Sequence, residues 1–167
     1  MFDISHLRVA TVGDAIPGDI IKIMGDDFWR LCFRCVDGGF RLLDLAEREF
    51  GGDKPCPPLH SDPIKNSESK PALILRKFSI HVEIDESVFI PQAKNVFQGN
   101  VMILEGEPVI VAYGFEREGL GVTYIRKDGQ QIPPTPDVAV AFFKNWRICA
   151  GESDGTSDII YQSSAAK

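Results

Sequence analysis

Short apolar segments separated by turn residues dominate the first third of the chain. The segments cover residues 19–24, 28–36 and 40–45, and the turns between them are Gly25-Asp26-Asp27 and Asp37-Gly38-Gly39. This turn chemistry is typical of β-hairpins. In the middle segment, one set of alternate positions is apolar throughout, and the other set carries both arginines. The first set is Trp29, Leu31, Phe33 and Cys35, and the second is Phe28, Arg30, Cys32, Arg34 and Val36. A period of two predicts a strand with one face in the core and the arginine-bearing face toward solvent.

A second series of apolar segments occupies the latter half of the chain. The expected strands cover residues 72–85, 101–105, 108–115, 121–127, 130–133 and 146–150. In the first of these, Ile74, Phe78, Ile80, Val82 and Ile84 are expected on one buried side. Glu105-Gly106-Glu107-Pro108 and Asp128-Gly129 are turn sequences. The pattern therefore predicts an antiparallel meander.

Two short helices are also expected. Residues 43–50 precede Gly51-Gly52, which can end a helix. Thr135 and Pro136 have the chemistry of a helix start, with the helix running over residues 137–144. That segment is apolar at nearly every position, so a buried strand is the alternative.

A proline-rich stretch separates the two series of strands. Residues 51–71 contain five prolines among polar residues and have no sustained apolar period, which predicts a loop or linker. We expect a mainly β protein with antiparallel sheets. A small barrel-like N-terminal lobe (1–52) is followed by the loop (53–70), a C-terminal β meander or sandwich with one or two short helices (71–151) and a partly disordered tail (152–167). A single integrated domain is the alternative.

Length and charge narrow the classes of protein. A chain of 167 residues can bury a core without disulfides or metal. Its 18 basic and 24 acidic residues give a net charge of −6, which disfavours broad attraction to nucleic acid or anionic membrane. No apolar run approaches the roughly 18 residues that span a bilayer, and the first residues lack the pattern of a signal peptide. We expect a cytoplasmic protein with reduced cysteines and no cofactor.

The cysteines offer one candidate metal site. Cys32 and Cys35 form a C-x-x-C pair, and with Cys56 and His60 they make a Cys3His set of the kind that holds structural zinc. Alternation along a strand, however, sends Cys32 and Cys35 to opposite faces. We therefore expect Cys35 in the core and Cys32 at the surface. The metal site is the alternative if a bulge turns both sulfurs to one side.

A polar row on the expected strand 72–85 is the candidate catalytic site. His81, Glu83 and Asp85 share one face, where an imidazole and two carboxylates could bind an ion or activate water. His60 or Asp62, from the proline-rich loop, could close over that face as part of a lid. The simpler interpretation is that these residues are the solvent-facing side of an ordinary strand.

A candidate basic surface lies on the first hairpin series. Its expected residues are Lys22, Arg30, Arg34 and Arg41, with Phe28 between them. Cations interleaved with an aromatic ring are typical of surfaces that bind single-stranded nucleic acid. The alternative is a solvated face whose arginines pair with Asp26, Asp27 or Asp44.

The motifs of several large enzyme classes are missing from the sequence. It has no G-x-S-x-G elbow, no phosphate loop, no G-x-G-x-x-G fingerprint and no H-E-x-x-H. The leading hypothesis is a non-enzymatic binding or assembly module that meets a protein partner, or a second copy of itself, through sheet edges. A small-molecule enzyme at His81 and single-stranded nucleic-acid binding at the arginines are the alternatives.

Overall fold

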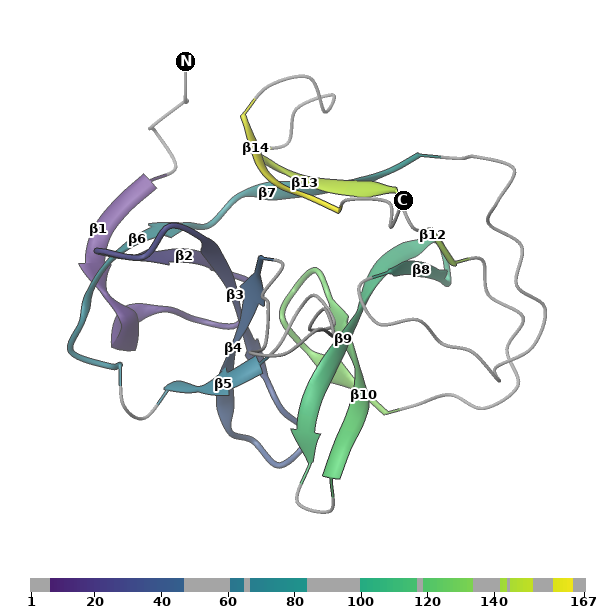
Figure 1. Cartoon of the computed structure of the whole chain (residues 1–167), viewed down its shortest axis with the longest axis horizontal. Coiled ribbons are helices and arrows are strands. Elements are labelled where there is room, and N and C mark those ends of the chain that lie inside the picture. Colours follow the sequence, from purple (N-terminus) through teal and green to yellow (C-terminus); the bar gives the residue numbers. More distant parts are fainter. Residues whose placement is uncertain are drawn as a thin grey trace, which may run out of the picture.

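The computed structural model describes residues 7–46, 61–64, 67–83, 100–116, 119–133, 142–143, 145–151 and 158–163. Within these ranges the protein is mainly β, with three antiparallel sheets and no closed barrel (Figure 1). The predicted β class is therefore confirmed, while the barrel-like first lobe is instead an open sheet. No helix in the described ranges is long and apolar enough to cross a membrane.

The first sheet contains six strands in the order β1-β6-β2-β3-β4-β5. They are β1 (Leu7–Thr11), β2 (Ile20–Ile23), β3 (Trp29–Arg34), β4 (Phe40–Leu45), β5 (Ser61–Pro63) and β6 (Pro71–Leu75), with a 3-10 turn, η2 (Val12–Asp14), after β1. Strands β2, β3 and β4 confirm the predicted hairpin series. The helix expected over residues 43–50 is wrong at its start, because residues 43–45 pair with β3 as part of β4. Residues 47–50 lie outside the described ranges.

The single strand expected over residues 72–85 is in fact two strands in different sheets. β6 lies between β1 and β2, whereas β7 (Phe78–Val82) belongs to the third sheet. Arg76 and Lys77 form the corner between them. At this corner the alternation shifts by one residue, so that Leu75 before it and Phe78 after it both face the same core cluster. Ile74 therefore packs in one core cluster and Phe78 in another, so the expectation that they share a side is wrong. The boundary expected at residue 71 does not coincide with a boundary between sheets.

The second sheet has the order β11-β10-β9-β8-β12. Its strands are β8 (Val101–Leu104), β9 (Glu107–Glu116), β10 (Gly119–Arg126), β11 (Gln131–Ile132) and β12 (Phe142–Phe143). Both predicted hairpins are confirmed. Glu105 and Gly106 have φ of 53° and 84°, the positive values that a two-residue hairpin turn requires. Of the helix expected over residues 137–144, only 142–143 are described, and they form a strand paired with β8.

The third sheet lies across the top of the molecule in Figure 1. It contains β7, β13 (Trp146–Ala150) and β14 (Ile159–Gln162) in the order β14-β13-β7. β13 confirms the strand predicted over residues 146–150. β14 lies within the segment expected as a partly disordered tail, and it pairs with β13 through a register shift.

One hydrophobic core joins the three sheets. Its fully buried members come from the first sheet (Ile20, Leu31, Phe33, Leu43, Leu75), the second (Val101, Ile110, Ala112, Ile125) and the third (Trp146, Ile148). Both predicted lobes thus contribute side chains to a shared core. A second cluster covers the other face of the first sheet and includes Ile21, Cys32, Leu42, Ile74, Val12 and Ile64. β3 is consequently buried on both faces, and the expected solvent-facing side is wrong.

Candidate functional site

The two cysteines of the C-x-x-C pair lie on opposite faces of the first sheet. Cys32 is fully buried in the second cluster, and Cys35 packs against the shared core. The predicted separation is confirmed, but the expected surface position of Cys32 is wrong because Val12 and Ile64 help to cover that face. Burial, reinforced by the Asp19 carboxylate, raises the pKa of the Cys32 thiol to about 12.

This arrangement does not favour zinc at the cysteine pair. A structural zinc site needs deprotonated thiols converging on one point. Burial also raises the pKa of the Cys35 thiol. Across the described ranges, no group of three or more His, Cys, Asp or Glu side chains could hold a metal ion. Cys56 and His60, the other two members of the expected set, lie outside those ranges.

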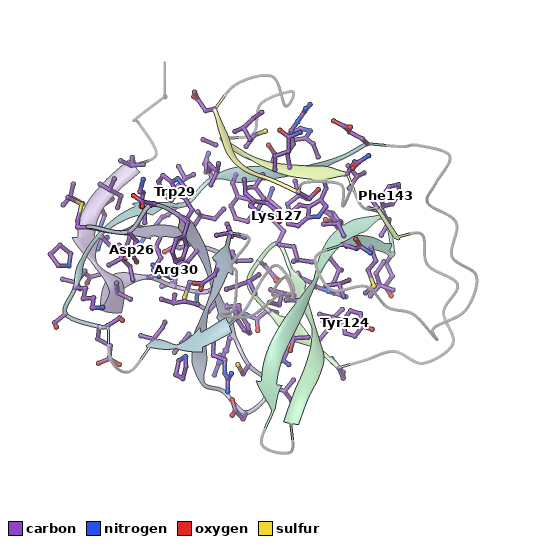
Figure 2. All side chains as sticks on the ribbon, viewed as in Figure 1. Asp26, Trp29, Arg30, Tyr124, Lys127 and Phe143 are labelled. Carbon is purple, nitrogen blue, oxygen red and sulfur yellow. The ribbon has the colours of Figure 1, made fainter. Side chains whose placement is uncertain are left out.

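Arg30 is a buried ion-pair residue rather than part of an exposed basic surface. It is only 8% exposed, and its guanidinium contacts the carboxylates of Asp26 and Asp44. Figure 2 shows Asp26, from the turn before β3, beside Arg30 of β3. The guanidinium also lies over the Phe28 ring, 4.3 Å from its centroid. Pairing with Asp26 and Asp44 is the alternative that the sequence left open for this arginine.

The remaining cations of the expected basic surface do not share one face. The register pairs Arg34 with Phe40, and Arg41 with the core residue Phe33. Arg34 is therefore on the face of Arg30, while Arg41 is on the core side. Lys22 has the same parity as Ile20, which also belongs to the core side. The expectation of a single basic face is wrong, because alternation within one strand does not set the register between neighbouring strands.

The candidate catalytic row lies on β7 beside β13. His81 pairs in register with Arg147, and its Nε2 is hydrogen-bonded to Oγ of Ser79 across 2.8 Å. Oε1 of Glu83 lies 3.6 Å from Nη1 of Arg147. These polar groups thus bind one another. Asp85 and His60 lie outside the described ranges, and of Asp62 only the backbone is described, in β5 opposite Leu42.

The outer strand β1 is an exposed edge of the first sheet. Among the described strands it pairs only with β6, and Figure 1 shows it at the left-hand edge of the view. Val9, at its middle, is 77% exposed. Arg8 is the only charged residue in the strand, and its Nη2 lies 3.9 Å from Oδ1 of Asp14. A five-residue edge with an exposed apolar residue is a surface on which another strand can pair.

Most of the other outer strands of the described sheets are better protected against pairing than β1. β5 has three residues and includes Pro63, while β11 and β12 have two residues each. β7 is as long as β1, and each strand has two polar residues, Ser79 and His81 in β7 and Arg8 and Thr11 in β1. β14 has four residues. Short strands, proline and polar side chains are the usual means by which natural proteins block edges.

A cleft opens where the three sheets meet. It has a volume of about 530 Å³ and is lined by the loop before β2, the corner between β6 and β7, and turns of the second sheet. Figure 2 shows Lys127, one of its lining residues, near the centre of the molecule. A concave space of this size is typical of small-molecule sites.

Backbone contact between two glycines fixes one wall of this cleft. A Cβ on Gly129 would lie 2.1 Å from the amide nitrogen of Gly18, and both glycines have positive φ. The Gly129 carbonyl accepts a hydrogen bond from the Arg34 amide at 2.7 Å, and the Gly18 amide donates to the Cys32 carbonyl at 2.9 Å. The turn of the second sheet is therefore held directly against the first sheet.

Neither of these two surfaces was found from the sequence. Residues 7–11 give only a weak strand signal, in which Leu7, Val9 and Thr11 alternate with Arg8 and Ala10. The lining of the cleft comes from segments far apart in the chain, so no spacing could reveal it. Comparison of the chain with protein-family models, with curated proteins and with solved structures finds no match.

Proposed function

We propose that the protein is a non-enzymatic assembly module that associates with a second copy of itself through the edge of β1. The observation that carries this proposal is Val9, which is 77% exposed in a five-residue strand paired on one side only among the described strands. Two first sheets would join into one continuous sheet across a two-fold axis. We also propose a cytoplasmic location, because four cysteines in 167 residues are few for a secreted domain held together by disulfides.

Antiparallel pairing of two β1 strands satisfies both the backbone and the side chains of the edge. Each strand supplies amide and carbonyl groups to the other, so edge groups exchange water for a sheet partner. With Val9 near the two-fold axis, the two Val9 side chains become cross-strand neighbours. A β-branched pair in this position contributes about 0.2–1 kcal/mol beyond the backbone hydrogen bonds.

The charges near this edge are compatible with such pairing. Asp14 accepts hydrogen bonds from the amide and the hydroxyl of Thr11, at 2.9 and 2.8 Å, and these bonds lower the pKa of its carboxyl. Asp14 therefore stays ionised beside Arg8 and offsets its charge. The net charge of −6 on each chain opposes association at long range, so moderate salt should strengthen the dimer by screening.

The test compares two exposed valines. Val9→Lys places a charge on the edge, whereas Val36→Lys changes a valine that is 71% exposed but lies outside the strands. Sedimentation equilibrium should find dimers of the wild type and of Val36→Lys, and monomers of Val9→Lys. Circular dichroism shows whether each variant remains folded. A monomeric wild type, or a Val9→Lys variant that dimerises like the wild type, would contradict the proposal.

The two alternative functions have less geometric support. The His81 and Glu83 side chains are engaged by Ser79 and Arg147, and the lining of the described cleft includes neither residue. Arg30 is buried, and Arg34 and Arg41 lie on opposite faces. Neither group offers the open, convergent surface that a catalytic or nucleic-acid site requires.

A further inference from the structure

We infer that Asp14 controls how much of the β1 edge a second copy of the chain can pair with, an inference that rests on the self-association proposed above. The Asp14 carboxylate already binds the amide of Thr11. That amide is one of the backbone donors that a partner strand would need. Asp14 thereby sets both the extent of the pairing along β1 and its strength.

Thr11 directs its amide and carbonyl groups away from β6, toward the free side of β1. In an antiparallel pair, alternate residues point these groups toward the neighbouring strand and away from it. The Val12 amide donates to the Lys70 carbonyl at 3.0 Å, so Val12 faces the chain of β6. Thr11 lies opposite Pro71, whose carbonyl accepts instead from the Met24 amide on the β2 side, at 2.9 Å. Both observations place the backbone groups of Thr11 on the outer edge.

By the same alternation, Leu7 and Val9 also present their amide and carbonyl groups on this edge. A dimer with Val9 on the two-fold axis uses all of these residues, because the two Val9 residues exchange hydrogen bonds and Leu7 of each copy lies opposite Thr11 of the other. A dimer centred on Arg8 would instead place two arginines directly opposite each other, and like charges in that position are destabilising. The edge therefore favours the register centred on Val9.

Asp14 withholds part of the ladder in this register. Its Oδ2 accepts hydrogen bonds from the Thr11 amide at 2.9 Å and from the Thr11 hydroxyl at 2.8 Å. The Leu7 carbonyl of the second copy needs the same amide, and it would meet a carboxylate oxygen, which is an acceptor facing an acceptor. The bonds between the Val9 residues and those donated by the Leu7 amides remain. The Asp14 carboxylate thus confines the pairing to the part of the edge around Val9.

The test compares two substitutions that remove the same charge. Asp14→Ala frees the Thr11 amide, whereas Asp14→Asn keeps a side-chain oxygen that can accept from it, as asparagine does at helix starts. Both variants lose the ion pair with Arg8 and carry the same net charge, so long-range repulsion between copies is equal. Sedimentation equilibrium should find that Asp14→Ala dimerises roughly tenfold to hundredfold more tightly than Asp14→Asn, because each dimer gains two amide hydrogen bonds.

Hydrogen exchange locates the added bonds. As the protein concentration rises, the Val9 amide should become more protected in both variants. The Thr11 amide should become more protected in Asp14→Ala and change little in Asp14→Asn. Asp14 is exposed, so circular dichroism and thermal unfolding should show that both variants fold.

The possible results separate this inference from the proposed function. Equal dimer affinities in Asp14→Ala and Asp14→Asn, or a monomeric Asp14→Ala, would overturn the role of Asp14, and the comparison of Val9→Lys with the wild type would still decide the proposed function. A monomeric wild type with a dimeric Asp14→Ala would overturn the proposed function and support the role of Asp14, since the edge would then pair only after the Thr11 amide is released.

Discussion

Nε of Arg30 lies 2.8 Å from Oδ1 of Asp44, and the two residues face each other in register across β3 and β4. Both are buried, and Asp26 approaches the same guanidinium from the turn before β3. A buried cation is tolerated only when it is paired and hydrogen-bonded. The pair therefore allows β3 to carry an arginine on a face that is covered by the second hydrophobic cluster.

Removing the charge of Arg30 should destabilise the fold strongly. In Arg30→Gln, the fully buried Asp44 carboxylate loses its contact with the charged Arg30 guanidinium, and we expect the free energy of unfolding to fall by about 3–5 kcal/mol. Urea denaturation measures the loss. The exposed Arg34→Gln should change stability by no more than about 0.5 kcal/mol.

A double variant separates the charge from the packing. Arg30→Gln combined with Asp44→Asn removes both charges, so it should recover part of the stability lost in Arg30→Gln alone. If Asp44→Asn lowers the free energy of unfolding by the same amount in Arg30→Gln as in the wild type, the two residues act independently.

The sequence predicts the local hairpins of this fold well because each one is encoded by residues close to its turn. Gly25-Asp26-Asp27, Glu105-Gly106 and Asp128-Gly129 all mark turns that the structure contains. Positive φ at Glu105, Gly106 and Gly129 gives these signals a direct backbone cause. The class of fold follows from the sum of such local signals.

Pairings between distant segments were not predictable in the same way. β6 enters the first sheet between β1 and β2, although β3, β4 and β5 intervene in the chain. Alternation shows that a segment has two faces but does not show what covers each face. The arginine-bearing side of β3 was therefore expected in solvent, whereas Cys32 on that side is fully buried.

The candidate sites show the same limitation. Arg34 and Arg41 are near each other in the sequence, but the register places them on opposite sides of the sheet. Arg76 and Lys127 are far apart in the sequence and line the same cleft. Chemistry that depends on register or on contact between sheets requires the three-dimensional structure.

Substitution of Gly129 tests the contact that joins the first and second sheets. In Gly129→Ala, the new Cβ would lie 2.1 Å from a backbone nitrogen of Gly18, at a residue with φ of 76°. We expect a loss of at least about 3 kcal/mol, from the left-handed backbone and from overpacking together. Gly106→Ala is the matched control, because φ is 84° there and nothing lies within 4 Å of the new Cβ. It should cost only about 1–2 kcal/mol in thermal or urea unfolding. Equal losses in the two variants would argue against a close approach at Gly129.

The pH dependence of stability should distinguish the carboxyls of Asp19 and Asp14. Burial raises the pKa of Asp19 above its ordinary value of 3.8, so from that pH up to the raised pKa the folded state binds more protons than the unfolded state. The wild type therefore loses stability relative to Asp19→Asn as pH rises through this window, and the stability of Asp19→Asn exceeds that of the wild type most at neutral pH.

Hydrogen bonds from Thr11 lower the pKa of Asp14, so the sign of the pH dependence reverses there. Asp14→Asn should lose stability relative to the wild type as pH rises from the lowered pKa to 3.8. Urea unfolding from acidic to neutral pH measures both differences, and a trend of the same sign in the two variants would contradict the burial of a costly carboxylate at Asp19.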